Sequence, residues 1–595
     1  MKLRSGFAAL LAVTALPWAL AVTAPHRSHI RPQIPASDRN APGRIFLEHA
    51  DRLKKDPTDS FMVLVGDVVF TKGPMTMRCD SAHYYTESES MDAFGNVRMT
   101  QGDTLEINGN ELNYNGFSEI AILYGAFDRP VHMRNRDVHL TTDIFNYDLV
   151  ADFGYYDTGG TLSDPSNTLT SLKGEYVPST KEANFFDNVH LNSRSEKDTL
   201  DIWSDTLFYN TGTHIAELYS PSTIKNWRGT IYTVHGVYDT DSDATVLYER
   251  PLVITKDGQT LTADTLHYDR ERGFGQAFGN MVLTDTAHHV AVHGQYGFYD
   301  EKADSSFVTG RAMLTEFSGP DTLWMHGRYI QTFRNFDVRE IAADTVAGTP
   351  ATTVTDTTHV AVVYPRVRFF RQDMQGVADS IRFTENDTVL RMYRCPVLWN
   401  ESRQVSGTRI DIKLNDSTIE RAFIPAEAFT AEHIEGEHYN QLSGKEMTAD
   451  FVDGEIRRLY IDGNVEIIMY PMENDSTYNK LVTAESSFLE AWFNKRTTER
   501  VKMWPQTTGV AIPLFLSRHS DYYLAKFKWY EPLRPTSHDD IFVIPEQMET
   551  AMGPEPPREI PWQALPLPER LIIDLNTDPE TTPPDNTENQ TNQSN

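Results

Sequence analysis

Two short phrases alternate along most of this chain, and both predict β-strands. The first joins a turn pair to an alternating strand, as in Phe94-Gly-Asn-Val-Arg-Met and Phe278-Gly-Asn-Met-Val-Leu. Gly, Asn and Asp tolerate positive φ, which suits a tight turn. In Val97-Arg-Met99 the two apolar side chains share one face and the arginine points to the other. This pattern predicts strands with one dry face and one wet face.

The second phrase leads from a small or acidic residue to an aromatic strand end. Examples are Thr142-Asp-Ile-Phe-Asn-Tyr and Ala263-Asp-Thr-Leu-His-Tyr. First phrases recur about every 30 residues and enclose one second phrase each, which is a spacing typical of repeat proteins. Each unit is too small to bury its own apolar face, so units must stack or pair. The sequence therefore predicts a repetitive, antiparallel, all-β protein with few helices.

The pattern also divides the chain into segments. Residues 486–500 fit a helix or a strand equally well, because their apolar positions suit both. We expect a signal peptide over 1–24, a flexible lead-in over 25–57, a first β region over 58–340, a linker over 341–360, a second β region over 361–510, an irregular extension over 511–545 and a disordered tail over 546–595.

The N-terminus indicates export. Lys2 and Arg4 precede an apolar run, and Val22-Thr-Ala24 offers the small residues that a signal peptidase requires. A membrane anchor is the alternative, but the run is short for a span and contains Pro17. No cysteine stands near the cleavage point for lipid attachment. Cys79 and Cys395 are the only cysteines, and their pairing cannot be deduced from the sequence.

Composition excludes one class of partner. Lys and Arg number 54 against 84 Asp and Glu, which gives a net charge of −30. Nucleic-acid binding depends on basic side chains that meet phosphate, so we expect no nucleic-acid partner. The acidic excess is consistent with the solubility of an exported protein.

Catalytic and metal motifs appear only as near misses. The glycines from Gly273 to Gly279 do not have dinucleotide-binding spacing, and Asp239–Asp243 lacks the glycine of a calcium loop. His289 and His293 share a strand face but lie roughly 13 Å apart, too far for one ion without further ligands. We therefore predict no enzyme activity, cofactor or metal site.

The repeated apolar face remains as the candidate site. Such a face forms either a closed core or an open groove, and a groove would bind acyl chains at about 0.8 kcal/mol per buried methylene. Methionine adapts to irregular ligands. The predicted lipid-binding residues are Val68, Phe70, Val97, Met99, Val131, Met133, Val189, Leu191, Met281 and Leu283, and the same face includes Val465 and Ile467.

The ordered alternation of Gly-Asn-Val-x-Met and Ala-Asp-Thr-Leu-x-Tyr phrases behind an export signal resembles the organic-solvent-tolerance (OstA/LptA-like) family. The likeness covers about 60–335 and is weaker over 362–504. It implies a taco-like β-jelly roll with an open groove, in the periplasm, that carries lipopolysaccharide toward the outer membrane. It further implies that lipid A acyl chains lie between the sheets. The implied partners are other transport components, including the outer-membrane translocon, joined by edge-strand pairing.

The chain departs from the simple family member in its length, which is similar to long forms of Bacteroidetes-type bacteria, and in its polar end. Whether its two β regions form one groove stays open, as does an association with the outer membrane. A structural or adhesive β-solenoid without a ligand is the main alternative. A β-helix carbohydrate enzyme is a weaker one, because no repeat breaks its pattern to supply a cluster of acid and base groups.

Overall fold

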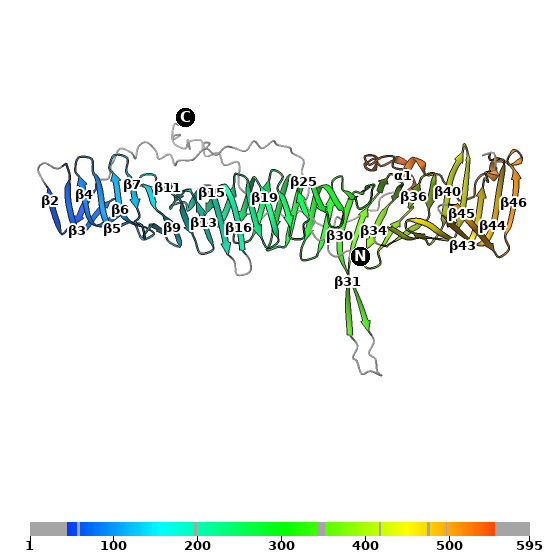
Figure 1. Ribbon diagram of the computed structural model, residues 1–595, viewed down its shortest axis with the longest axis horizontal. Helices are drawn as coiled ribbons and strands as arrows, with labels where there is room; N and C mark the ends of the chain where they lie inside the picture. The colour runs from blue at the N-terminus through cyan, green and yellow to red at the C-terminus, as the bar shows by residue number, and fades with distance from the viewer. Residues whose placement is uncertain are drawn as a thin grey trace, which may run out of the picture.

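The protein is a long ladder of antiparallel strands stacked along one axis (Figure 1). This computed structural model describes residues 45–55, 60–194, 199–341, 352–415, 418–472, 477–494 and 497–553. Those residues form 46 strands that belong to one hydrogen-bonded network. Short 3-10 turns and a single α-helix, α1 (Glu546–Met552), complete the described part. The predicted all-β class is confirmed.

Strand pairing divides the network into two sheets, which we call sheet 1 and sheet 2. Ten long strands run through both: β3 (Met62–Lys72), β4 (Met75–Tyr85), β5 (Ser90–Gln101), β6 (Leu105–Asn115), β15 (Glu182–Arg194), β16 (Thr199–Asn210), β25 (Phe274–Asp285), β26 (Val290–Asp300), β43 (Glu455–Met469) and β44 (Lys480–Asn494).

The remaining strands belong to one sheet each. Sheet 1 contains β2 (Arg52–Lys55), β7 (Ile120–Tyr124), β10 (Ile144–Asp148), β11 (Phe153–Tyr156), β14 (Lys173–Val177), β17 (Ile215–Leu218), β20 (His235–Asp239), β21 (Ala244–Tyr248), β24 (Thr265–Asp269), β27 (Ser305–Thr309), β30 (Tyr329–Ile341), β31 (Thr352–Tyr364), β34 (Ser380–Thr384), β35 (Val389–Tyr393), β38 (Arg409–Asn415), β39 (Thr418–Ile424), β42 (Glu446–Val452) and β45 (Thr497–Trp504). Sheet 2 contains β1 (Phe46–His49), β8 (Val131–Asn135), β9 (Val138–Thr142), β12 (Gly160–Ser163), β13 (Asn167–Ser171), β18 (Ser222–Asn226), β19 (Gly229–Thr233), β22 (Leu252–Thr255), β23 (Thr260–Thr262), β28 (Met313–Glu316), β29 (Leu323–His326), β32 (Val367–Arg371), β33 (Met374–Ala378), β36 (Val397–Asn400), β37 (Arg403–Ser406), β40 (Ala428–Glu435), β41 (His438–Gly444) and β46 (Thr508–Pro513).

The Gly-Asn pair of the first phrase marks the corner where a strand passes from sheet 1 to sheet 2. In β5, Gly95 and Asn96 have φ of 75° and 45°, and the pairing register with β4 and β6 shifts across them. Gly279 and Asn280 repeat this geometry in β25. Our interpretation of the pair as a tight turn between strands was therefore wrong. The same tolerance of positive φ is used for a β-bulge, which bends one continuous strand.

The aspartate of the second phrase packs against this corner. Asn96 donates a hydrogen bond from Nδ2 to Asp80 Oδ2 at 2.8 Å, and Asn280 bonds Asp264 in the same way at 2.8 Å. A Cβ on Gly95 would lie 2.5 Å from the Asp80 carboxylate. At the corners of β5 and β25 the two phrases are thus neighbours in space.

Several predicted boundaries shift. Of the expected linker, residues 342–351 lie outside the described residues, and residues 352–360 belong to β31, which pairs with β30 in a projecting hairpin (Figure 1). Strands β1 and β2 occupy the end of the expected lead-in, because they complete the first edge of each sheet. Helix α1 begins at the expected start of the tail. Residues 486–494 belong to β44 and residues 497–500 to β45, so these described residues form strands rather than a helix. The expected signal peptide lies outside the described residues.

Residues 514–553 form a strap that returns along the outer face of sheet 2, seen in orange and red at the C-terminal end of Figure 1. The side-chain amide of Gln441 bonds the backbone of Tyr522 and Leu524, and Gln404 bonds the backbone of Lys528 and Tyr530. Each amide therefore binds an extended backbone at a carbonyl and at the N–H two residues later. Trp399, Val377 and Val397 of the outer face pack against strap residues Leu533, Met548 and Met552.

Candidate functional site

The ten predicted lipid-binding residues all face the interior between the sheets. Their exposed fractions run from 0% to 4%. They belong to one hydrophobic cluster that extends from Leu64 to Ala491, through both predicted β regions. All ten lie on the inner face of sheet 2, in β3, β5, β8, β15 and β25.

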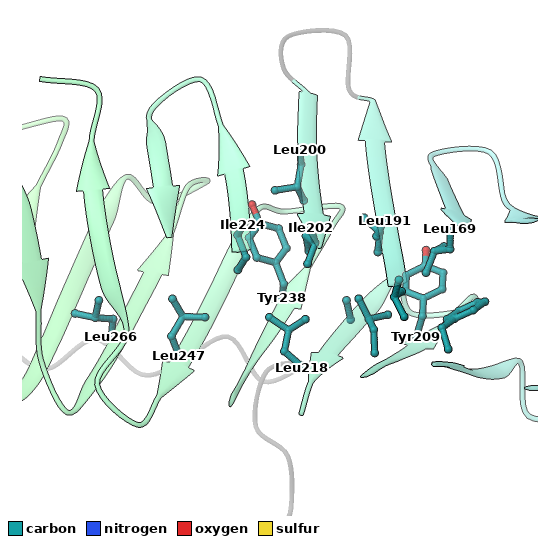
Figure 2. Close-up of a cluster of buried hydrophobic side chains, with 14 of the residues drawn as sticks. Leu169, Leu191, Leu200, Ile202, Tyr209, Leu218, Ile224, Tyr238, Leu247 and Leu266 are labelled. Atoms are coloured by element: carbon teal, nitrogen blue, oxygen red, sulfur yellow. The ribbon is translucent and has the colours of Figure 1, made fainter. Parts of the chain in front are cut away.

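Sequence reasoning missed the opposite wall. The inner face of sheet 1 carries Leu112, Leu123, Phe145, Leu207 and Leu218, each at most 2% exposed. Figure 2 shows leucine and isoleucine side chains of both sheets meeting in this interior. The signal was present in the second phrase, whose last apolar and aromatic residues also alternate with a period of two.

The interior is packed rather than hollow. A cavity of about 30 Å³ lies near its N-terminal end, and such a volume suits roughly one water-sized group. Four flexible methionines line it: Met75, Met77, Met91 and Met99. An acyl chain therefore requires the two sheets to separate.

A series of tyrosines closes the edge opposite the corners. Tyr114, Tyr176 and Tyr209 end strand segments of sheet 1 and reach the hairpin ends of sheet 2. Lys72 Nζ donates to the Tyr114 hydroxyl at 2.7 Å. The amides of Asn135 and Asn167 donate to Tyr176 and Tyr209 at 2.9 and 2.7 Å. The other two links join Tyr147 to Gln101 and Tyr268 to Arg228. We call these five links the tyrosine seam.

The tyrosine seam closes the edge at which the resemblance implies an open groove. Figure 2 shows Tyr209 and Tyr238 rising between the sheets, with the Tyr209 hydroxyl beside the strand that carries Leu169. Burial raises the pKa of Tyr176 and Tyr209, so both phenols stay neutral. Each neutral hydrogen bond contributes about 1 kcal/mol net. The edge is thus closed by single hydrogen bonds, three between neutral groups and two in which Lys72 or Arg228 is the charged donor.

The first link also holds an ion pair. Lys72 Nζ lies 3.0 Å from the Glu119 carboxylate, and both side chains are less than a quarter exposed. Burial alone would lower the pKa of Lys72, but the bonds to Tyr114 and Glu119 raise it, so the ammonium stays charged beside the methionine-lined cavity. The second phrase predicts aromatic strand ends such as Tyr147 and Tyr268, but it predicts neither Tyr114 and Tyr176 nor the partners of the seam. Their nearly constant separation, between 40 and 46 residues, is the signal that could have found them.

Side chains of the motifs that resemble metal or calcium sites form hydrogen bonds with neighbouring residues of the chain. His288 bonds Asp285, and Asp239 accepts backbone N–H groups from its own turn. Within the described residues, no group of three His, Cys, Asp or Glu side chains is placed to hold a metal ion. Cys79 is buried, with its thiol pKa raised to about 11 by burial, whereas Cys395 is exposed, and the two are not paired. No helix in the described part is long and apolar enough to cross a bilayer.

Comparisons with known proteins give one family match. Residues 43–197 match the family described as OstA-like protein. A search of curated proteins gives no match. Among solved structures, the chain is similar to LptH, described as the LptA homologous periplasmic component of the conserved lipopolysaccharide transport device from Pseudomonas aeruginosa. That similarity has 13% identity and a TM-score of 0.16 and covers 22% of this chain and 78% of that one.

Proposed function

We propose, from the premise that residues 43–197 form an OstA-like region, that this protein binds lipopolysaccharide acyl chains between its two sheets and carries or bridges the lipid toward the outer membrane. One observation carries the proposal. A single apolar interior runs along the ladder, and its long edge between β3 and β24 is closed by weak polar links.

The corner and the seam suggest how lipid would enter. The covalent corner holds one edge, so the sheets would part at the tyrosine seam. Opening the three links in which both partners are neutral would cost about 3 kcal/mol, whereas ten methylenes removed from water contribute about 8 kcal/mol. The lipid gain therefore exceeds the loss of a few links, although some contacts between the sheets are also exchanged for contacts with lipid. The phosphates and sugars would stay at the seam.

The methionine-lined cavity is the best starting point for entry. It lies beneath the Lys72–Tyr114 link, where the interior already has free volume. Methionine side chains change rotamer at low cost and suit a ligand of variable shape. The Lys72 ammonium would then face the lipid phosphate when its bond to Tyr114 opens, because it already lies at this rim.

The two ends of the ladder support a bridging role. Within the part of the chain that the structure describes, β1 and β2 pair with β3 on one side, and β45 and β46 pair with β44. Side chains on these strands are largely exposed, including Phe46 at 60% and Val510 at 57%. Exposed edge strands pair readily with further strands, so we expect other transport components, including the translocon, to join there in the periplasm.

A structural β-solenoid without a ligand is a second candidate, because the interior is so well packed. The two functions differ in a binding experiment. Purified protein is mixed with fluorescent lipopolysaccharide, and uptake is followed over time. We expect binding, and we expect Tyr176→Phe, which breaks the link to Asn135 but keeps the ring, to speed uptake several-fold, because one link of about 1 kcal/mol is lost.

Tyr155→Phe is the matched control, since Tyr155 alternates with the buried Tyr156 and stacks on Phe153 of the outer face. Its uptake rate should equal that of the unmodified protein. Absence of any uptake by the unmodified protein would reject lipid carriage and favour the structural solenoid.

A further inference from the structure

Part of the outer face of sheet 1 is apolar and buried, although it points away from the interior. In β20 and β21, Val237 and Val246 alternate with the interior residues Tyr238 and Leu247. Val237 and Val246 are 1% and 0% exposed and form a separate cluster with Ala244, Ile215 and Tyr248. A strand that is apolar on both faces is covered on both faces.

The same face continues as an aromatic track toward the C-terminal half. Tyr296 and Phe307 of β26 and β27 are 6% and 3% exposed and cluster with Phe278, Phe298 and Tyr329. Ring centroids of Phe307 and Tyr329 lie 5.2 Å apart, and those of Tyr329 and Tyr364 lie 5.5 Å apart. The track therefore runs from β20 to the end of β31, where the chain turns the corner into sheet 2.

The strap ends beside the β31 end of this track. Arg366, two residues after Tyr364, donates from Nη2 to the Gly553 carbonyl at 2.7 Å. Arg394, at the next corner, donates to the Met552 carbonyl at 3.4 Å. The described contacts of the strap before this point are with sheet 2, at Gln441, Gln404 and Arg368. At Gly553 the chain has reached the edge between the two sheets.

The sequence that follows has the composition of a face-binding segment. Residues 554–575 contain Ile560, Trp562, Leu565, Leu567 and Leu571 among six prolines. Proline has no N–H to donate, so such a segment suits docking on a sheet face through side chains rather than addition to a sheet edge.

Chain length allows the contact. From β31 to β20, sheet 1 advances seven strand spacings, or about 34 Å. The 22 residues of 554–575, at about 3.1 Å per residue in an extended proline-rich chain, reach about 68 Å. We propose that residues 554–575 of this chain dock on the outer face of sheet 1 between β20 and β31, so that strap and tail together wrap both sheets around the corner. This inference does not depend on the proposed lipid binding.

Hydrogen exchange on truncated chains tests the proposal. The full-length protein is compared with a chain that ends at Gly553 and with a control that ends at Leu575. We expect amide exchange in β20, β21 and β27 to rise at least tenfold in the shorter chain and to stay unchanged in the control, because only the first loses the docking segment. Amides of β5 and β16 serve as an internal check that the N-terminal part remains folded.

A photo-reactive residue at position 562 of the full-length chain provides the second readout. Crosslinks to residues 235–309 of the same chain support the proposal, and a mixture of isotope-labelled and unlabelled protein separates them from crosslinks to another copy. Unchanged exchange in the shorter chain overturns the proposal. So do crosslinks that form only with a second copy or with residues 25–44.

Discussion

The N-terminal part of the ladder, from β3 to β16, and the C-terminal part, from β32 to β41, share one interior but differ on the outer face of sheet 2. In the N-terminal part this face carries exposed charge, as in the Arg98–Glu106–Arg134 network with distances of 3.0 and 3.3 Å. In the C-terminal part the same face carries Arg368 and Trp399, which are 1% and 0% exposed beneath the strap.

The difference shows that the inner and outer faces of a strand follow independent sequence patterns. Alternation on the inner face is common to both parts and produces the shared core. The residue types on the outer face depend on what covers that face. They are charged where the sheet meets solvent, and they are apolar or bond the strap backbone where the strap covers the sheet. Among the described residues, the N-terminal part is held by its core, corners and seam. The C-terminal part is also held from outside, so sheet separation should be easier in the N-terminal part.

The largest effect should come from the shared interior. Ile202 of β16 is fully buried, and Ile202→Asp places an unpaired charge in the core. We expect loss of more than about 4 kcal/mol of stability and unfolding of the N-terminal part. Trp203→Asp is the control, because Trp203 faces outward with 41% exposure. Chemical denaturation of both variants checks this, and equal losses would contradict the assignment of inner and outer faces.

The second prediction compares the loss of one charge on the outer face of sheet 2 beneath the strap with the loss of one charge on the solvent-exposed outer face. Asp540 lies 3.2 Å from Arg368, whose pKa is lowered by burial. Asp540→Asn leaves a buried guanidinium without its charge partner, and we expect a cost of about 2 kcal/mol with release of the strap. Glu106→Gln removes the equivalent charge from the exposed network and should cost at most about 0.5 kcal/mol. Similar costs for the two variants would remove the distinction between the faces.

A pH series gives the third prediction, on the outer face of sheet 1. Burial, with the ring packed against Phe278, lowers the pKa of His267 to about 4, although the hydrogen bond to Gln276 acts in the opposite direction. The unfolded chain binds the proton more readily, so the stability contribution is complete above about pH 6.5 and falls as pH drops toward 4. We expect His267→Gln to flatten the decrease in unfolding free energy between pH 6.5 and 4.5. An unchanged slope would show that this imidazole is accessible to protons in the folded state.

The smallest effect tests the corner that both parts share. Asn96 has φ of 45° and bonds Asp80. Asn96→Ala should cost about 1 to 2 kcal/mol, because alanine is strained at positive φ and makes no such bond. Asn96→Gly removes the bond alone and should cost less. The two variants are compared by their thermal midpoints, and a lower midpoint for glycine than for alanine would argue against the corner geometry.

Period-two alternation predicted the strands and the inner face of sheet 2 correctly, because alternate side chains point to one side whatever the strand pairs with. The Gly-Asn pair does not distinguish a turn from a bulge, because positive φ suits both equally and only strand pairing decides between them. The tyrosine seam escaped detection because its partners, such as Asn135 and Tyr176, meet through stacking of repeats. The strap escaped for a similar reason, since Gln404 and Gln441 are ordinary surface residues until a distant segment covers them.

Site-specific photocrosslinking at Met99, beside the methionine-lined cavity, tests the central claim most directly. A photo-reactive residue at 99 is compared in cells with one at Arg98, the neighbouring outward position on β5. We predict that lipopolysaccharide is captured at position 99 and not at position 98, because only the inner face contacts acyl chains. Capture at neither position, or equal capture at both, would contradict lipid carriage between the sheets.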